Sequence, residues 1–442
     1  MAIKPLAILI VAASFYSVLP ASAQNASVQK ELPEGNGKQI VQSACAVCHS
    51  LATVTNSGHS REDWNTVLHM MVNVGAPVPP DKFDTVVDYL AKSLPPKPQP
   101  MGVTVPGAVQ VSIKEWEVPT PGSRPHDPMY APDGMVWYSG QMANVLGRFN
   151  PKTQQFTEFH PKMAGSGPHG IISGKDGNIW FTANFKGYIG KFNPKTGETT
   201  EYRLPDPKAR DPHTPLFAPN GMMYFTVQSA NMVGRLDPKT GEIKLVTSPT
   251  PKSNPYGMVI SSKGVPIFCE FGSNKIASID PDTLAIHEWV LPHEDSRPRR
   301  IAITPDDAVW YSDYSRGYLG RLDTNTGKVT GEWPSPSGPK SQPYGITAIG
   351  NIVWYVESNS VPNMLVRFDP KTEKFQSWPI PSGGGVVRNM VHTPDGNLWM
   401  AESGVNRIGF VQVKDSANQD LRSKASRLNK KDAAGNAAYR GK

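Results

Sequence analysis

Cysteine, unbalanced charge and long apolar runs are all scarce in this sequence. Only 3 of its 442 residues are cysteine, which is too few to hold so long a chain together as a disulfide scaffold. The formal net charge is +7, but residues 24–413 are nearly neutral, so nothing predicts nucleic acid or an anionic membrane surface as a partner. No G-x-G-x-x-G segment joins a strand to a helix, which gives no indication of a nicotinamide site.

The first 23 residues have the pattern of a secretory signal peptide. An apolar run over residues 6–19 follows Lys4, and residues 21–23 read Ala-Ser-Ala. The run is shorter than the roughly 18 apolar residues that a membrane span needs, so we predict cleavage after Ala23. No later segment is apolar enough to cross a bilayer, and we therefore expect a soluble protein exported to the periplasm. Residues 414–442 are predicted to form a disordered basic tail.

Residues 45–49 read Cys-Ala-Val-Cys-His, a C-x-x-C-H motif. At this spacing two thiols on one helical turn add to the two haem vinyl groups, while the adjacent histidine reaches the iron. We predict one covalent haem c bound by Cys45 and Cys48, with His49 as an axial ligand. A redox dithiol or half of a zinc site is the alternative, but no second cysteine pair exists to complete a zinc site. The remaining Cys269 is expected to be a small core residue.

The segment around this motif resembles a small class I-like cytochrome c over residues of about 34–94. Apolar spacing predicts helices over 37–44, 60–71 and 81–93. The second helix starts with a capping-box-like pair, Ser60 and Asp63. The resemblance implies that the last helix packs across the first. We assign residues 24–94 to this all-α domain.

The resemblance also suggests the second axial ligand of the iron. The stretch from Trp64 to Ala76 resembles the methionine loop of small bacterial cytochromes, which implies Met71, with the adjacent Met70 as the alternative. His59 or His69 would instead give a bis-histidine site of lower potential. A thioether ligand raises the potential of a haem and suits an electron acceptor.

A repeat fills most of the remaining chain. Four prolines among residues 95–100 predict a semi-rigid linker, taken as 95–111. Beyond it, residues 112–413 repeat an Asp-Gly-type turn, an aromatic strand and a Gly-Arg-Phe-like strand about every 43 to 46 residues. Such a period is the signature of a propeller blade. Seven repeats predict an all-β seven-bladed propeller after the all-α cytochrome c domain, closed by pairing of a strand near 111–118 with 408–413.

The repeat resembles the virginiamycin B lyase family of streptogramin-linearising enzymes. The resemblance rests on W-[FY]-x-x followed by G-[RK]-[FL] and preceded by P-[HY]-G. It implies a histidine in one of the last two blades, Glu-Pro-His in the next, a further acid and a magnesium ion. Here blade six has Tyr344 and the last blade has Arg388 at the histidine position. The nearest match is displaced to His169 and Asp211-Pro212-His213, where Gln228 replaces the final acid.

One position in the repeat carries a polar side chain in every blade. It is occupied by His126, His169, His213, Tyr256, Arg299, Tyr344 and Arg388. Equivalent positions form a ring about a propeller axis, so we expect these side chains at a solvent-reachable mouth of the channel, where replacing them leaves stability nearly unchanged. Arginines suit a carboxylate or similar anion, and three imidazoles suit zinc or copper. The alternative is that the ring only joins neighbouring blades by hydrogen bonds.

Three functional hypotheses follow from these features. The first is an oxidoreductase or electron-transfer protein, in which the haem accepts electrons from a small anionic substrate at the propeller or from a redox partner protein. The second is a lyase or hydrolase of a cyclic ester, and the third is a propeller that only docks a redox partner. The candidate catalytic residues are His126, His169, Asp211, His213, Arg299 and Arg388. An additional metal ion at the propeller mouth is the second cofactor considered.

Overall fold

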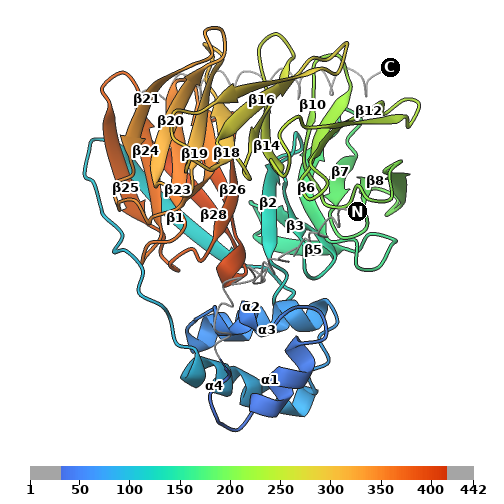
Figure 1. The fold of residues 1–442 in the computed structure, drawn as a ribbon, viewed down its shortest axis with the longest axis vertical. Helices are drawn as coiled ribbons and strands as arrows, with labels where there is room; N and C mark the ends of the chain where they lie inside the picture. The colour runs from blue at the N-terminus through green and yellow to red at the C-terminus, as the bar shows by residue number, and fades with distance from the viewer. Residues whose placement is uncertain (1–30, 416–442) are drawn as a thin grey trace, which may run out of the picture.

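Two kinds of secondary structure occupy different parts of the chain (Figure 1). The computed structural model describes residues 31–415, so the predicted signal peptide and residues 416–442 of the predicted tail lie outside the described residues. Helices α1 to α4 lie between residues 38 and 93, and the strands lie between residues 110 and 414. Figure 1 shows the helices below one end of a ring of sheets. Within the described range, no helix is long and apolar enough to span a membrane.

Four short helices form the first part. They are α1 (Lys38–Cys45), α2 (Ala52–Thr55), α3 (Arg61–Asn73) and α4 (Phe83–Ser93), with the 3-10 turn η1 (Pro80–Lys82) before α4. The helices α1, α3 and α4 coincide closely with the three predicted ones, while α2 and η1 are additional. Ser60 caps α3 as predicted, because its Oγ accepts a hydrogen bond from the backbone N–H of Asp63 at 3.1 Å.

These helices share one apolar core. Trp64 and Leu68 of α3 lie in a buried cluster with Val41 of α1 and Leu90 of α4. The Trp64 indole donates a hydrogen bond to the carbonyl of Leu94 at 3.0 Å, which ties α3 to the end of α4. The core explains why the three helices pack together. The interpretation of this part as a cytochrome c domain stays a prediction.

Seven four-stranded antiparallel sheets form the second part, and the prediction of a seven-bladed propeller is confirmed. The innermost strands are β2 (Pro125–Tyr130), β6 (Pro168–Ser173), β10 (Pro212–Phe217), β14 (Pro255–Ile260), β18 (Pro298–Ile303), β22 (Pro343–Ile349) and β26 (Val387–His392). The second strands are β3 (Val136–Gly140), β7 (Ile179–Ala183), β11 (Met223–Val227), β15 (Pro266–Glu270), β19 (Ala308–Asp313), β23 (Ile352–Glu357) and β27 (Leu398–Glu402).

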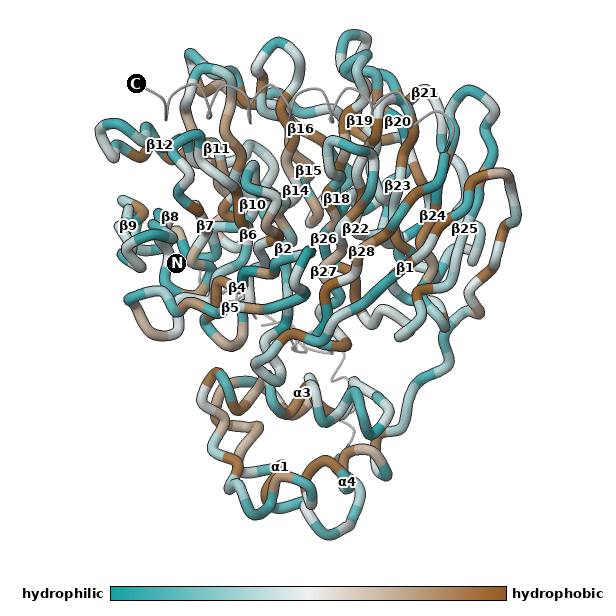
Figure 2. The backbone as a smooth tube through the Cα atoms, turned by 180° about the vertical axis from the view of Figure 1, so that it is seen from behind, coloured by the Kyte–Doolittle hydropathy of each residue, from teal (hydrophilic) through white to brown (hydrophobic). Residues whose placement is uncertain are grey.

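The outer half of each blade completes the sheet. The third strands are β4 (Val145–Asn150), β8 (Tyr188–Phe192), β12 (Met232–Leu236), β16 (Lys275–Ile279), β20 (Tyr318–Asp323), β24 (Met364–Asp369) and β28 (Arg407–Lys414). The outermost strands are β5 (Gln155–Phe159), β9 (Thr199–Arg203), β13 (Ile243–Thr247), β17 (Ile286–Val290), β21 (Lys328–Pro334), β25 (Lys374–Pro379) and β1 (Gln110–Glu117). Figure 2 shows the apolar residues concentrated along the strands, with hydrophilic loops at the rim.

The repeated aromatic and glycine residues pack directly on each other within a blade. Tyr138 of β3 pairs with Gly147 of β4, and a Cβ at Gly147 would lie 1.9 Å from the Tyr138 ring. The same holds for Phe181 and Gly190, where the separation would be 2.2 Å. In these blades only glycine leaves room for the ring, which explains why G-[RK]-[FL] follows the aromatic strand. Blades four and six have Ala277 and Val366 at this position instead.

The propeller closes between its first and last strands. The strand β1 pairs antiparallel with β28, with Val111 opposite Val413 and Trp116 opposite Ile408. This pairing completes the seventh blade, whose strand order is β1-β28-β27-β26. The predicted closure is therefore confirmed, and it gives the seventh blade four paired strands like the other six.

The segment predicted to be a semi-rigid linker is fixed along the side of the sixth blade. The Gly102 N–H donates to the carbonyl of Val361 at 3.1 Å. The Val105 N–H donates to Ser377 Oγ at 2.8 Å, and the Ser377 N–H donates back to the Val105 carbonyl at 3.0 Å. These bonds hold the chain against the propeller (Figure 1), so it is less free than a proline-rich spacer alone would be.

The helices contact the end of the propeller at which the innermost strands begin. Asn73 Nδ2 donates a hydrogen bond to the carbonyl of Pro121 at 2.9 Å. A Cβ at Gly122 would lie 2.5 Å from the backbone nitrogen of Met70, so α3 approaches this turn closely. The turn leads directly into β2 (Figure 1), which carries His126.

Candidate functional site

The seven predicted ring residues all stand second in their innermost strands. We call their side chains the channel ring: His126, His169, His213, Tyr256, Arg299, Tyr344 and Arg388. Just after this position the ladder with the second strand shifts register in every blade, for example between Pro125 and Pro128. Such irregularities re-aim a side chain and are frequent next to functional sites.

A chain of side-chain hydrogen bonds links neighbouring blades at the same level. Thr182 Oγ1 accepts from the Gly170 N–H at 2.9 Å and donates to the carbonyl of His213 in the next blade at 2.7 Å. Cys269 takes the equivalent place, accepting from Gly257 and donating to the Arg299 carbonyl at 3.1 Å. Cys269 is thus more than a small core residue. The signal in the sequence is a Ser, Thr or Cys at one fixed place in the first five blades, whereas blades six and seven have Val356 and Ala401 there.

The rings of the three histidines lie against one another in order, tilted by 41° and 49°. The ring centroids of His126 and His169 lie 3.5 Å apart, those of His169 and His213 3.8 Å, and those of His213 and Tyr256 3.8 Å. The Tyr256 hydroxyl is hydrogen bonded to that of Tyr344 from two blades further on. Contacts between blades that are not adjacent place these side chains around the propeller axis.

Arginine completes the other side of the channel ring. The Arg299 guanidinium lies 3.9 Å from the ring centroid of Tyr344 and 4.3 Å from that of Tyr314. Phe271 and Tyr256 stand 4.7 Å and 5.6 Å from the same guanidinium. These aromatic faces fix the orientation of Arg299 without neutralising its charge.

The ring is more deeply enclosed than the sequence predicts. His126, His169 and His213 are 2%, 3% and 2% exposed, and Tyr344 is fully buried, whereas Arg299 and Arg388 are half-buried. The expectation of a solvent-reachable mouth is therefore wrong for the histidines, because their rings lie against one another and are almost fully buried. Replacing these histidines is therefore expected to lower stability, contrary to the sequence-based expectation, because removal of buried side chains leaves cavities.

Two further charged residues, one position after the ring residues of their strands, belong to the site. Asp127 Oδ1 accepts hydrogen bonds from Arg300 at 2.8 Å and from His126 Nδ1 at 2.9 Å. Both Asp127 and Arg300 are buried. Asp127 was not predicted from the sequence. It follows the ring residue His126, and the register shift between Pro125 and Pro128 is the feature that would have identified it.

Burial governs the ionisation of the histidines. It lowers the pKa of His126 well below its usual range, and the positive charge of Arg388 adds to this effect. Burial lowers the pKa of His169 and His213 in the same way. All three imidazoles are therefore neutral near pH 7.

The arginines act on one another and on the tyrosine pair. Burial, followed by the charge of Arg388, lowers the pKa of the Arg124 guanidinium to about 9. Burial by itself would raise the pKa of the Tyr344 phenol, but Arg299 and Arg388 reverse that effect and lower it. Positive charge around the ring contributes to both shifts, after burial for Arg124 and against burial for Tyr344.

A set of metal-donor atoms lies inside the ring. His126, Asp127 and His169 each offer one donor atom, and these atoms lie within 4.8 Å of one another. Neutral imidazoles and a carboxylate suit a divalent cation by donor type. The predicted trio contained His213 instead of Asp127, but His213 Nδ1 lies 2.9 Å from Thr214 Oγ1. A cation here would compete with Arg300 for the Asp127 carboxylate, and metal binding stays a prediction.

Of the six candidate catalytic residues, the structure brings five together and leaves Asp211 apart. Asp211 precedes β10 with a φ of 69°, and its Oδ2 accepts a hydrogen bond from Ser229 at 2.6 Å. Its other oxygen accepts from Asn184. These bonds occupy the carboxylate at the entrance of the strand, while His213 two residues later enters the channel ring.

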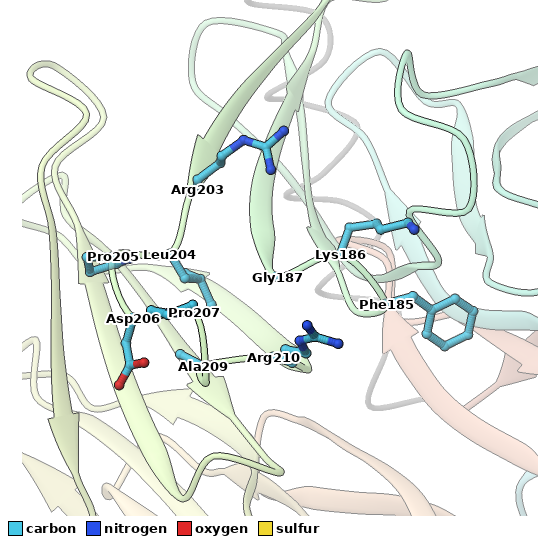
Figure 3. A pocket seen from close by; sticks show the side chains of 10 residues that line it. All are labelled: Phe185, Lys186, Gly187, Arg203, Leu204, Pro205, Asp206, Pro207, Ala209 and Arg210. Carbon is cyan, nitrogen blue, oxygen red and sulfur yellow. The ribbon is translucent and has the colours of Figure 1, made fainter.

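A surface pocket of about 420 Å³ lies near Asp211, and no channel-ring residue lines it (Figure 3). Its walls are the loop between β7 and β8 and the segment that leads from β9 toward β10. Lys186, Arg203 and Arg210 lie around the opening, against a single carboxylate from Asp206. The pocket is therefore separate from the site that the ring forms.

The C-x-x-C-H residues lie where α1 ends. Cys45 is the last residue of α1 and half-buried, Cys48 is exposed, and both thiols are free. His49 Nδ1 lies 3.2 Å from the carbonyl of Ser50. A proton on Nδ1 leaves Nε2 as the free nitrogen of this imidazole.

Helix α3 presents its two methionines differently. Met71 follows Trp64 by two helical turns, so helical spacing places it on the Trp64 side of α3, where it is half-buried and is not part of the apolar cluster. Met70 is buried outside that apolar cluster, at the contact with Gly122. The alternative ligands make other contacts: His59 stacks edge-on against Trp64 at 4.7 Å, and His69 lies 4.4 Å from Phe83.

Comparisons with known proteins cover the propeller. The sequence profile of the Virginiamycin B lyase family matches residues 107–348 and 285–421. The chain is similar to the structure of virginiamycin B lyase from Staphylococcus aureus, with 25% identity over 69% of this chain and 99% of that chain and a TM-score of 0.62. A structure of streptogramin B lyase gives 25% identity over 69% and 98% of the two chains and a TM-score of 0.63.

A third similar structure contains a ligand of the lyase. It is a catalytically inactive histidine-to-alanine variant of the Staphylococcus aureus enzyme with quinupristin, 26% identical over 69% of this chain and 99% of that chain, with a TM-score of 0.62. No curated protein sequence matches the chain. The helices before residue 107 lie outside the family match. Because that match spans more than half of the chain and covers every blade, the protein belongs to the virginiamycin B lyase family.

Proposed function

We propose that this protein is an exported c-type haem protein that transfers electrons, acting as an oxidoreductase whose substrate site is the propeller channel. One observation carries the proposal: the helical part with the C-x-x-C-H motif packs on the turn that leads into β2 and the channel ring. Lyase chemistry needs no electron carrier, whereas a redox reaction in the channel does.

The residues of the helical part fit a covalent haem by their chemistry. Cys45 ends α1, Cys48 lies in the turn that follows it, and both thiols are free. Each thiol would add across one vinyl double bond, with sulfur bonding to one carbon and hydrogen to the other, so the attachment is redox-neutral. His49, with Nδ1 near the Ser50 carbonyl, would offer Nε2 to the iron, and Met71 would offer its thioether sulfur as a second ligand. Haem bound in this way supplies one-electron chemistry.

The channel ring would bind and orient the substrate. The half-buried Arg299 and Arg388 would hold an anionic group. His169 is neutral, and its Nδ1 has no hydrogen-bond partner, so this atom, when it carries the proton of the neutral imidazole, would donate a hydrogen bond to the anionic group of the substrate. The buried rings around it would exclude water from the reacting group.

Expression with haem maturation, under export, tests the first half of the proposal. The wild-type chain should carry one haem that survives denaturation, and Cys45→Ser with Cys48→Ser should carry none. Cys269→Ser is the matched control, because it removes the third cysteine but keeps a hydroxyl for the bonds to Gly257 and Arg299. Haem absent from the wild type, or lost in Cys269→Ser, contradicts the assignment.

Substrate-driven haem reduction under anaerobic conditions tests the second half. Small anionic substrates should reduce the haem of the wild type, which the visible spectrum of the haem reports. Arg388→Gln should lower the rate of this reduction at a given substrate concentration. A substrate that is consumed while the haem stays oxidised would contradict the oxidoreductase proposal.

A lyase activity on a cyclic ester is the second candidate, and family membership favours it. The departures at Tyr344, Arg388 and Gln228 argue against the site arrangement that the resemblance implies. Mass spectrometry of a streptogramin incubated with the protein distinguishes the two candidates. A linearised product, formed equally well by the Cys45→Ser, Cys48→Ser variant, would establish the lyase function.

A further inference from the structure

Positive charge is concentrated in the propeller channel. Arg124 directly precedes β2, Arg299 and Arg388 are ring residues of β18 and β26, and Arg300 follows Arg299. The charge of each of them lowers the pKa of His126. Asp127 forms an ion pair with Arg300 at 2.8 Å. Among residues 31–415 no carboxylate pairs with the other three arginines. The channel therefore holds an excess of about three positive charges.

The uncharged neighbours orient these arginines but do not neutralise them. Arg299 is held by aromatic faces, the nearest being Tyr344 at 3.9 Å. The Nε atoms of Arg299 and Arg388 are buried without a hydrogen-bond partner, as is Nδ1 of His169. Buried donors that lack a partner cost free energy unless a ligand or water satisfies them.

The ionisation states of the site also favour an anion over a cation as its ligand. The histidines are neutral because of burial, and the Arg124 guanidinium, with a pKa lowered to about 9, is destabilised by burial and by Arg388. A divalent cation at the His126, Asp127 and His169 donors would add two more positive charges and weaken the Arg300 ion pair. An anion would instead relieve the repulsion and accept hydrogen bonds from the unpartnered nitrogens.

We propose that the channel binds a small oxyanion ligand with two negative charges, held by the guanidiniums of Arg124, Arg299 and Arg388 and by His169 Nδ1. A short dicarboxylate and a phosphate share this chemistry. That the ligand is the substrate rests on the proposed function, whereas its binding depends only on the channel. Arg124 is new to the site, and it stands two residues before His126 at the entrance of β2.

Isothermal titration calorimetry of the full chain at low salt tests the proposal. Malonate and phosphate are the two oxyanion probes, and malonamide is the uncharged counterpart of malonate. The wild type should bind at least one of the anions at one site per chain and should not bind malonamide. The anion that binds more tightly identifies the class, dicarboxylate or phosphate.

Arginine variants test which residues hold the anion. Arg388→Gln and Arg124→Gln should each weaken binding about ten- to a hundredfold. Arg388→Lys, which keeps the charge but loses the forked donor, should weaken binding less. Arg321→Gln is the control, because Arg321 pairs with Asp306 at 2.7 Å on the outside of a blade. This variant should bind the anion with the same affinity as the wild type.

Two outcomes would overturn the proposal. The first is a folded wild type, judged by near-ultraviolet circular dichroism, that binds neither anion. The second is a titration in which Zn²⁺ binds, Asp127→Asn abolishes that binding, and neither anion competes; this result would make the channel a metal site. Should Arg388→Gln fail to fold, the affinity of Arg388→Lys decides the role of this residue.

The haem-free variant separates this proposal from the proposed function. Cys45→Ser with Cys48→Ser should bind the anion as tightly as the wild type, because no channel residue is changed. Anion binding without any substrate-driven haem reduction would leave the anion site standing and overturn the redox function alone.

Discussion

The candidate site of the helical part is contiguous in the sequence, whereas that of the propeller is spread over seven repeats. In the helical part, the two thiols and the imidazole lie within residues 45–49. In the propeller, the channel ring draws one residue from each of seven strands, from His126 to Arg388. A contiguous motif needs only local structure, whereas the ring exists only because the sheet closes through β1 and β28.

The two sites also differ in exposure. Cys48 is exposed and Cys45 half-buried, but the ring histidines are no more than 3% exposed. A group that must receive a cofactor after folding has to stay accessible. A group that excludes water from a channel is buried, and it then needs partners such as Asp127 and the Thr182 bonds.

The largest effect is expected in the helical part. If Met71 on the Trp64 side of α3 is the axial ligand, Met71→Ala should abolish the thioether–iron charge-transfer band and lower the midpoint potential. Met70→Ala should leave the band in place, because Met70 lies at the propeller contact. Visible spectra and potentiometry of the two variants check this. Loss of the band in Met70→Ala alone would move the ligand, and no change in either variant would favour His59 or His69.

The next effect tests the bonds that join the blades. Thr182→Val removes the partner of the Gly170 N–H and of the His213 carbonyl, so the free energy of unfolding should fall by about 2 to 4 kcal/mol. Thr199→Val is the matched control, because Thr199 Oγ1 has no hydrogen-bond partner. Its stability should stay within about 0.5 kcal/mol of the wild type. Denaturant unfolding measures the stability of both variants. Equal free energies of unfolding would show that the Thr182 hydrogen bonds between blades contribute nothing to stability.

The smallest effect concerns the pH dependence of stability. Burial lowers the pKa of His213 below the unfolded value of about 6.5. Below that pH the unfolded chain takes up a proton that the folded chain does not, so the free energy of unfolding falls by up to about 1.4 kcal/mol per pH unit. Above it the histidine contributes no slope. Between pH 7.5 and about 5.5, His213→Gln should therefore lose less stability than the wild type, and parallel losses would contradict the buried, neutral state.

The seven-bladed fold and the ring membership were predictable from the repeat. An aromatic residue opposite a glycine, as in Tyr138 and Gly147, recurs in four blades for steric reasons, and the spacing of this position counts all seven, although Ala277 and Val366 replace the glycine in blades four and six. The same spacing aligned the ring residues. Asp211 was a candidate catalytic residue from the family resemblance, not from the ring spacing. It lies apart from the ring because its partners Ser229 and Asn184 come from loops whose geometry the repeat does not encode.

The sequence by itself determined the number of blades, the ring residues and the C-x-x-C-H motif, because each depends on local spacing or on exact repetition. Only the tertiary structure decided how deeply the histidines are buried, that Asp127 pairs with Arg300 from the fifth blade, and that α3 packs on the turn before β2. These features depend on distances between residues far apart in the chain. Closure of the propeller fixes the first two distances, and the bonds that hold residues 101–105 to the sixth blade help to fix the third.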